Sequence, residues 1–227
     1  MGSSTAVAHP DCASDDRVNA LELRIVELEL KVGSQQAPDA DAEKAAAAIY
    51  ERLGNFVRNG DIDSAREALA ELTAKYSNTT AYRRARKIER ELEVIGKDAP
   101  LNLVVEKWYR GEFRGEQTDF NSYKPTLLIF WEVWCPHCRR EVPKIQQTWD
   151  RYGTDMNIVG LTKITRSATE EKVEEFLSEN GVYYPVAKEN GDLSKHFNVS
   201  GIPAAAVVKG GKIVWRGHPG RLSDDMI

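Results

Sequence analysis

The sequence predicts an α/β sandwich that follows an all-α region. A continuous apolar run at 126–131 has the length and composition of a strand that is buried on both faces. A helical pattern follows this run, and a second apolar run at 156–164 then repeats the first. Strand, helix and strand in this order form a right-handed parallel crossover, which is the repeating unit of α/β proteins. Residues 41–95 instead carry helical periodicity throughout.

The composition is that of a folded protein with no affinity for nucleic acid. The 227 residues exceed one average domain, so we expect one catalytic-size domain with an attached region. Hydrophobic residues make up 41% and charged residues 29%, with a net charge of -4, and these values are typical of globular chains. The basic residues form no stripe interleaved with aromatic ones, which argues against a nucleic-acid partner. No window reaches the roughly 18 apolar residues of a membrane-spanning helix.

The N-terminal segments are predicted to be a tail, a short helix and a linker. Residues 1–16 have no periodicity, so we expect a disordered tail, in which Cys12 is an unassigned thiol. Residues 17–32 are predicted to form a coiled-coil helix, because apolar residues keep heptad spacing from Val18 to Val32. This helix either assembles copies of the chain or packs against its own chain, since short isolated helices are marginal. Residues 33–40 are interpreted as a linker.

Residues 41–96 are predicted to form three helices that carry no chemistry. The first ends at the turn Asn59-Gly60-Asp61, Asp63 caps the second, and Gly96 closes the third. Six residues are expected to face inward: Ile49, Leu53, Phe56, Ala65, Leu69 and Leu72. Their spacing resembles one tetratricopeptide unit followed by a capping helix, and a plain three-helix spacer fits equally well.

Residues 97–227 are predicted to form the second domain, where helical periodicity gives way to short apolar strands. Residues 101–108 and Phe113 are expected in short strands around Gly111. The later elements are two helices and a hairpin: 170–180, 192–197, and 204–208 with 212–215. Residues 222–227 are interpreted as the start of a terminal helix that is cut short.

The candidate reactive site is the pair Cys135 and Cys138. Both lie at the start of the helix that follows the strand at 126–131. Unpaired backbone N–H groups and the helix dipole stabilise a thiolate at such a position. Three residues along the helix, Cys138 returns to the face of Cys135 and can form a disulfide with it. We therefore predict that Cys135 attacks the substrate and that Cys138 resolves the mixed disulfide.

The two residues between the cysteines adjust this chemistry. Pro136 suits the first helical turn, because its missing N–H would have no partner there. His137 is predicted to stabilise the thiolate, which makes the disulfide a stronger oxidant. A redox-active disulfide needs no further cofactor, and we expect none. We also expect no metal site, since one Cys-x-x-Cys supplies only part of a closed zinc site.

Three segments carry a family resemblance: Phe130-Trp131-Glu132-Val133-Trp134-Cys135-Pro136-His137-Cys138, Glu141 with Pro143, and Gly201-Ile202-Pro203. Together they resemble the thioredoxin superfamily, which implies a three-layer sandwich with a central mixed sheet flanked by helices. The Trp-Cys-x-x-Cys-x-x-Glu-x-Pro arrangement is similar to the TlpA/ResA-like branch of extracytoplasmic thiol-disulfide proteins. The dipeptide between the cysteines instead resembles that of the oxidase DsbA. The resemblance covers the chain from about Ala99 onward.

The resemblance implies a thiol-disulfide oxidoreductase that acts on exported proteins. It implies that Ile202-Pro203 is a cis peptide beside the cysteines, a bond that is rare outside X-Pro sequences. It further implies that Trp134, Ile202 and Pro203 contact the substrate. The expected partners are protein thiols and disulfides and a separate redox partner protein.

The proton acceptor for the resolving thiol departs from the family pattern. Thioredoxin carries a buried aspartate six residues before its first cysteine, and that position is Ile129 here. Glu141 matches an acidic residue of the branch, so it serves as acid or base for Cys138, or it is a solvated helix glutamate or a partner for Arg140. Glu132 is the weaker candidate, because its place after the strand also fits a surface residue.

The direction of electron flow has two interpretations. His137 favours an oxidase or isomerase, to which we incline, and assembly through residues 18–32 would favour an isomerase. The branch resemblance favours a reductase, for example in cytochrome maturation. An interaction scaffold on residues 17–96 with an ancillary redox domain is the alternative of another class. We expect a periplasmic or membrane-anchored location outside the cytoplasm, because the cytosol would hold an oxidising pair reduced.

Overall fold

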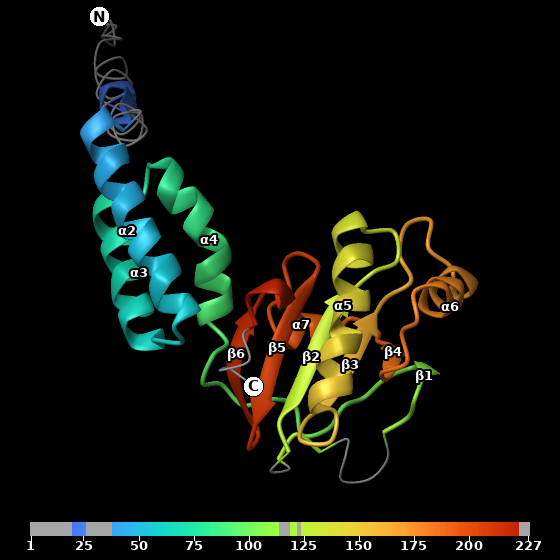
Figure 1. The fold of residues 1–227 in the computed structure, drawn as a ribbon. Coiled ribbons are helices and arrows are strands. Elements are labelled where there is room, and N and C mark those ends of the chain that lie inside the picture. The colour runs from blue at the N-terminus through green and yellow to red at the C-terminus, as the bar shows by residue number, and fades with distance from the viewer. Residues whose placement is uncertain (1–19, 26–37, 114–118, 122–123, 223–227) are drawn as a thin grey trace, which may run out of the picture.

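A computed structural model describes residues 20–25, 38–113, 119–121 and 124–222 of the chain. It shows an all-α region followed by a central sheet with helices on its faces, which confirms the predicted fold class (Figure 1). Across these residues, no helix has the length and apolar character that a membrane crossing requires.

Several predicted segments fall wholly or mostly outside the described residues. They are the tail with Cys12, most of the helix at 17–32, most of the linker and the terminal helix at 222–227. Within them, residues 20–25 are helical and expose Leu21, Leu23 and Ile25 to solvent. The coiled coil therefore stays a prediction.

The all-α region consists of three helices: α2 (Ala40–Arg58), α3 (Ile62–Tyr76) and α4 (Thr80–Leu92). The predicted turn after α2 is confirmed, but the prediction that Asp63 caps α3 is wrong. Asp61 is the N-cap, and its Oδ1 accepts a hydrogen bond from the Ser64 N–H over 3.1 Å. Gly60 has a φ of +71°, so the chain turns there and the next residue is the one placed to cap the new helix.

Small residues let these three helices approach closely. Most of the residues expected to face inward are buried, but Phe56 and Leu69 are only half-buried. On α2 the buried stripe runs in steps of four residues through Ile49, Leu53 and Val57, so Val57 takes the place that Phe56 was expected to fill. Alanines from all three helices complete the core: Ala46, Ala65, Ala68, Ala81 and Ala85.

The α/β part is built on a six-stranded sheet. Its strands are β1 (Lys107–Arg110), β2 (Thr126–Trp131), β3 (Asn157–Thr162), β4 (Val186–Lys188), β5 (Ala204–Lys209) and β6 (Lys212–Gly217). The strand order is β1-β4-β3-β2-β5-β6, with β2, β3 and β4 parallel and the other neighbours antiparallel. The helices are α5 (Pro136–Tyr152), α6 (Glu170–Glu179) and α7 (Asp192–His196), and a 3-10 turn, η2, spans Pro219–Arg221.

Two strand predictions need correction. The expected strand at 101–108 begins only at Lys107, and Leu101 and Val104 are exposed rather than packed in the sheet. Strand β4 has three residues, which is too short for a periodic pattern to reveal, and the sequence did not predict it.

Strand β2 separates two apolar cores. All six of its residues are buried, as the continuous apolar run predicts. Leu127, Ile129 and Trp131 belong to the core under α5 and α6, whereas Leu128 and Phe130 belong to the core under α7. Successive side chains of a strand point to opposite faces, so this alternation follows from the pleat.

The all-α region packs against the β6 edge of the sheet. The Gly96 N–H donates to the Ile213 carbonyl over 2.8 Å, and Val94 joins the same core as Leu128. At the end of α4 the buried Glu91 binds the Arg221 guanidinium over 2.6 Å. The segment after α4 is therefore joined to the sandwich by a backbone hydrogen bond and by Val94, and α4 itself is joined to it by an ion pair.

Replacing Phe197 by alanine should lower the free energy of unfolding by about 3–5 kcal/mol, the usual cost of emptying an aromatic site in a core. Phe197 is fully buried, and its ring centroid lies 5.6 Å from that of Phe130. Urea unfolding measures the change. Val214→Ala is the control, because Val214 lies on β6 and is 44% exposed. Equal unfolding midpoints for the two variants would contradict this account of the core.

Candidate active site

The end of β2 and the start of α5 hold both cysteines. Cys135 is the N-cap of α5, and Pro136 occupies the first helical position. The Cys135 N–H donates to the Glu132 carbonyl over 3.1 Å, and the Cys135 carbonyl accepts from the Arg139 N–H over 3.0 Å. The reactive pair therefore lies at a helix N-terminus, where backbone N–H groups and the helix dipole favour negative charge.

Both cysteines are free thiols in this structure and are nearly enclosed. Cys135 is 5% exposed and Cys138 is 0% exposed. The Cys135 Sγ lies 3.8 Å from the Ile202 carbonyl oxygen, to which it donates. The Ile202-Pro203 peptide bond is cis, as the resemblance implies, and Pro203 is buried beside the half-buried Ile202. The structure thus brings together two segments that are 67 residues apart.

Cys138 is the thiol that keeps its proton. Burial is the largest cause and raises the pKa of Cys138 far above its ordinary value, while the Glu132 backbone N–H opposes this by bonding the sulfur. The hydrogen bond to Cys135 and the negative charges of Cys135 and Glu132 raise the pKa of Cys138 further. The Cys138 proton therefore leaves only when another group takes it.

Glu132 is buried, which corrects its interpretation as a surface residue. Its side chain is 6% exposed and accepts a hydrogen bond from the Trp134 Nε1–H over 2.6 Å. The Thr165 hydroxyl donates to the same carboxylate oxygen. Strand β2 ends immediately before Glu132, so this residue belongs to the turn that joins β2 to α5.

Glu141 lies on α5, one helical turn after Cys138. Its Oε1 accepts from the Lys144 Nζ over 2.9 Å, so the expected pairing with Arg140 is wrong. The lysine lies three residues along α5, on the same side of the helix as Glu141. A negative charge on Glu141 also acts on His218, which lies beside Gly220. The contacts found for Glu141 in the described part of the chain include neither sulfur.

His137 is exposed and bonds Arg140 rather than a sulfur. The Arg140 Nη2 lies 2.6 Å from the His137 Nδ1. A guanidinium can only donate, so Nδ1 accepts and a neutral ring carries its proton on Nε2. The stabilisation of the thiolate by His137 stays a prediction.

Trp134 joins the active-site turn to the loop that follows β3. Besides Glu132, its Nε1–H approaches the Thr165 Oγ1 at 3.2 Å. The Arg166 guanidinium stacks over the indole at 3.7 Å from the ring centroid. Sequence reasoning missed Thr165 and Arg166, because neither lies in a periodic segment or a motif.

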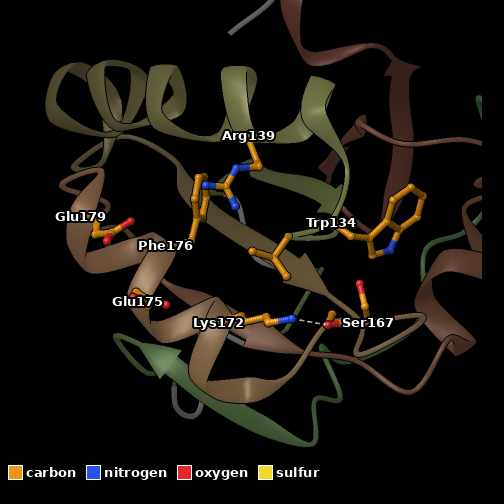
Figure 2. A pocket seen from close by; sticks show the side chains of 9 residues that line it. Trp134, Arg139, Ser167, Lys172, Glu175, Phe176 and Glu179 are labelled. Atoms are coloured by element: carbon orange, nitrogen blue, oxygen red, sulfur yellow. Dashed lines mark hydrogen bonds between the residues drawn. The ribbon is translucent and has the colours of Figure 1, made fainter.

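A cavity of about 350 Å³ opens beside these residues, between α5 and α6. Figure 2 shows Arg139, Lys172 and Trp134 around it, with Phe176 beneath the arginine. The residues that line it are Val133, Trp134, Arg139, Ser167, Ala168, Lys172, Glu175, Phe176 and Glu179. Val133 and Trp134 directly precede Cys135, so the cavity adjoins the reactive pair.

Comparison with known proteins finds similarity to redox proteins around this site. A family described as Thioredoxin-like matches residues 122–214. Sporulation thiol-disulfide oxidoreductase A of Bacillus subtilis is 29% identical over 87 residues, which are 37% of this chain and 53% of that protein. Thiol-disulfide oxidoreductase ResA of Bacillus thuringiensis is 27% identical over 124 residues, 53% of this chain and 67% of that one.

A solved structure of StoA from Bacillus subtilis shares 26% identity, with a TM-score of 0.40, over 43% of this chain and 75% of that chain. The chain spans about half to two thirds of the length of the curated relatives named above. Residues 122–214 therefore resemble a thioredoxin-like domain, and the curated proteins to which the chain is similar include thiol-disulfide oxidoreductases.

Proposed function

We propose that this chain is a protein thiol-disulfide oxidoreductase that exchanges disulfides with extracytoplasmic protein substrates through Cys135 and Cys138. The observation that carries the proposal is the placement of both thiols at the N-terminus of α5, with Cys135 against the Ile202 carbonyl. Thiolate attack on a disulfide requires a stabilised anion and a second thiol within reach, and this arrangement supplies both. The names of the relatives support the same chemistry.

The exchange proceeds in two balanced steps. The Cys135 thiolate attacks one sulfur of a substrate disulfide, which forms a mixed disulfide and releases the other substrate sulfur as a thiolate. Cys138 then loses its proton and attacks the Cys135 sulfur. This step closes the Cys135–Cys138 disulfide and releases the second substrate sulfur. The substrate gains two electrons and the enzyme loses two, and the reverse sequence oxidises a dithiol.

Glu132 is the carboxylate that we assign to the resolving thiol in this scheme. Its backbone N–H bonds the Cys138 sulfur, and the negative charge of its side chain raises the pKa of that thiol. Its burial removes most of the solvent that would screen this charge. Glu141 stays the second candidate on its match to the branch.

The substrate is proposed to lie against Trp134, Ile202 and Pro203. The Ile202 carbonyl lies at the Cys135 sulfur, and the half-buried Trp134 directly precedes Cys135 in the chain. An extended chain along the Ile202 backbone would present its sulfur to Cys135. This is the binding mode that the thioredoxin resemblance implies.

We favour oxidation or isomerisation over reduction as the direction of exchange. The support is His137, because Arg140 occupies Nδ1 and leaves the Nε2 proton free to donate. The Trp-Cys-x-x-Cys-x-x-Glu-x-Pro arrangement supports the reductase alternative. We further propose that residues 41–96 serve as a spacer and that residues 17–32 self-associate. The protein is also proposed to need a separate redox partner protein but no cofactor.

Cys135→Ser should abolish the reduction of insulin by dithiothreitol through this protein, because it removes the attacking thiolate. Cys138→Ser should instead accumulate a mixed disulfide between Cys135 and the substrate, since no second thiol resolves it. Turbidity measures the first effect and non-reducing electrophoresis the second. A Cys135→Ser protein that retains the parent rate would refute the proposed function.

His137→Pro should lower the reduction potential of the pair, because it removes a hydrogen-bond donor from the thiolate of the reduced state. A change of about 30 mV corresponds to about 1.4 kcal/mol for this couple. Equilibration with glutathione buffers measures the potential, and His196→Ala is the control because His196 lies on α7 and bonds the Asp98 carbonyl. An unchanged or higher potential would show that His137 does not act on the sulfur.

Glu132→Gln in a Cys135→Ser background should lower the pKa of Cys138, because it removes the nearby negative charge and leaves the thiolate less disfavoured. The background removes the coupling between the two sulfurs, so the titration reports one thiol. Ultraviolet absorbance of the thiolate follows it across pH. Glu141→Gln in the same background tests the rival, and a larger drop for that variant would transfer the role to Glu141.

A further inference from the structure

We propose that the cavity between α5 and α6 binds an acidic side chain of the substrate polypeptide, close in sequence to the reacting cysteine. The proposal deepens the proposed function and rests on it, since it assigns a substrate preference to the same site. It concerns the nine lining residues described above, of which Arg139 and Lys172 determine the sign of the preference.

The cavity lies at the edge of the sheet that carries Cys135. Strands β2 and β3 are parallel, and α5 and α6 follow them in the chain, so both helices begin at the carboxyl edge of the strands. Arg139 lies in the first turn of α5, where its backbone N–H bonds the Cys135 carbonyl. Lys172 lies in the first turn of α6. Two cationic side chains, one from each helix, therefore line the cavity that adjoins the active-site turn.

In the described part of the chain, each cation contacts a group other than a carboxylate. The Arg139 guanidinium lies 4.9 Å from the centroid of the Phe176 ring, and the Lys172 Nζ donates to the Ser167 carbonyl over 2.7 Å. Neither belongs to any of the ion pairs found among the described residues. A carboxylate that entered the cavity would therefore gain a charge-assisted contact without displacing a carboxylate from either cation.

The carboxylates of the cavity lie farther from the sulfur. Glu175 and Glu179 follow Lys172 by three and seven residues, so they share its face of α6 and lie one and two turns deeper. Figure 2 shows them on the side of the cavity opposite Trp134. The charge along the cavity thus changes from positive on the side of Trp134 to negative at the far end. An acidic residue next to the substrate cysteine meets the positive end, and a lysine there is repelled.

The walls of the cavity are already in place before a substrate binds. Trp134 is held by its hydrogen bond to Glu132 and by the Arg166 guanidinium over its ring. Phe176 is buried beneath Arg139. A volume of about 350 Å³ accommodates one side chain and part of its backbone. Because aromatic and cationic groups are ordered in advance, binding requires little further loss of side-chain freedom.

The test measures how fast Cys135 forms a mixed disulfide with two peptides in the Cys138→Ser protein. Both peptides carry one cysteine activated as its thionitrobenzoate disulfide, and they differ only in having Asp or Lys on each side of it. The Asp peptide should react about tenfold faster, the lower end of the range for electrostatic steering. Release of thionitrobenzoate reports the rate, so the assay needs no enzymatic turnover.

Charge reversal by Arg139→Glu with Lys172→Glu should invert the preference, and Arg139→Lys with Lys172→Arg should keep it. The matched control is Lys195→Glu with Lys209→Glu, which changes the net charge equally at exposed positions on α7 and β5. Equal rates for the two peptides in the parent protein, or the same inversion in the control, would overturn the proposal. If the parent protein reacts faster with the Asp peptide but fails to reduce insulin, the proposed function is refuted. The proposed binding site for an acidic side chain is then still supported.

Discussion

The reactive pair depends on the turn at Glu132, whose backbone acts on both cysteines. The Glu132 carbonyl accepts from the Cys135 N–H, and hydrogen bonding by the Glu132 backbone lowers the pKa of Cys138 against the effect of burial. These bonds form only if β2 ends at Trp131 and α5 begins at Pro136, so the register of the whole strand and helix is transmitted to the two sulfurs. Six consecutive buried residues hold β2 in that register, because a slip would move each of them to the wrong core.

The pairing of the other strands with β2 positions the residues around the turn between β2 and α5. Antiparallel pairing with β2 positions β5, and β5 begins directly after Pro203, so the Ile202 carbonyl is brought to Cys135 by the sheet rather than by local contacts. On the other side of β2, parallel pairing places the end of β3 beside Glu132, and the loop that follows β3 supplies Thr165. The site is therefore assembled at one edge of the sheet from three neighbouring strands.

The sequence predicted those parts of the fold that leave a local signature. The strand at 126–131, the helix that follows it and the position of Cys135 and Cys138 were all legible, because burial and helix initiation each restrict residue type. The cap of α3 was misplaced by two residues, since Asp61 and Asp63 are equally good capping residues and only the turn at Gly60 selects between them. Strand β4 was missed because its pairing partners, rather than its three residues, define it.

The two carboxylates of the site, Glu132 and Glu141, also differ in whether the local sequence indicates their contacts. Glu141 was named from its spacing to Cys138, yet its bond is to Lys144. Glu132 was placed lower because a glutamate after a strand usually faces solvent. What buries it is contact with Trp134 and with Thr165, which lies 33 residues away. No local pattern records that contact, so its importance emerged only in three dimensions.

Trp134 belongs both to the wall of the cavity and to the hydrogen bonds around the reactive pair, so it links substrate recognition to redox state. Its ring forms part of the cavity wall, while its Nε1–H bonds the carboxylate whose charge acts on Cys138. A ligand that presses on the ring therefore changes the environment of the sulfur, and oxidation of the sulfur changes the environment of the ligand. Thermodynamic linkage requires these two effects to be equal in free energy. A cargo that is held more tightly by one oxidation state must, to the same extent, bias the protein toward that state.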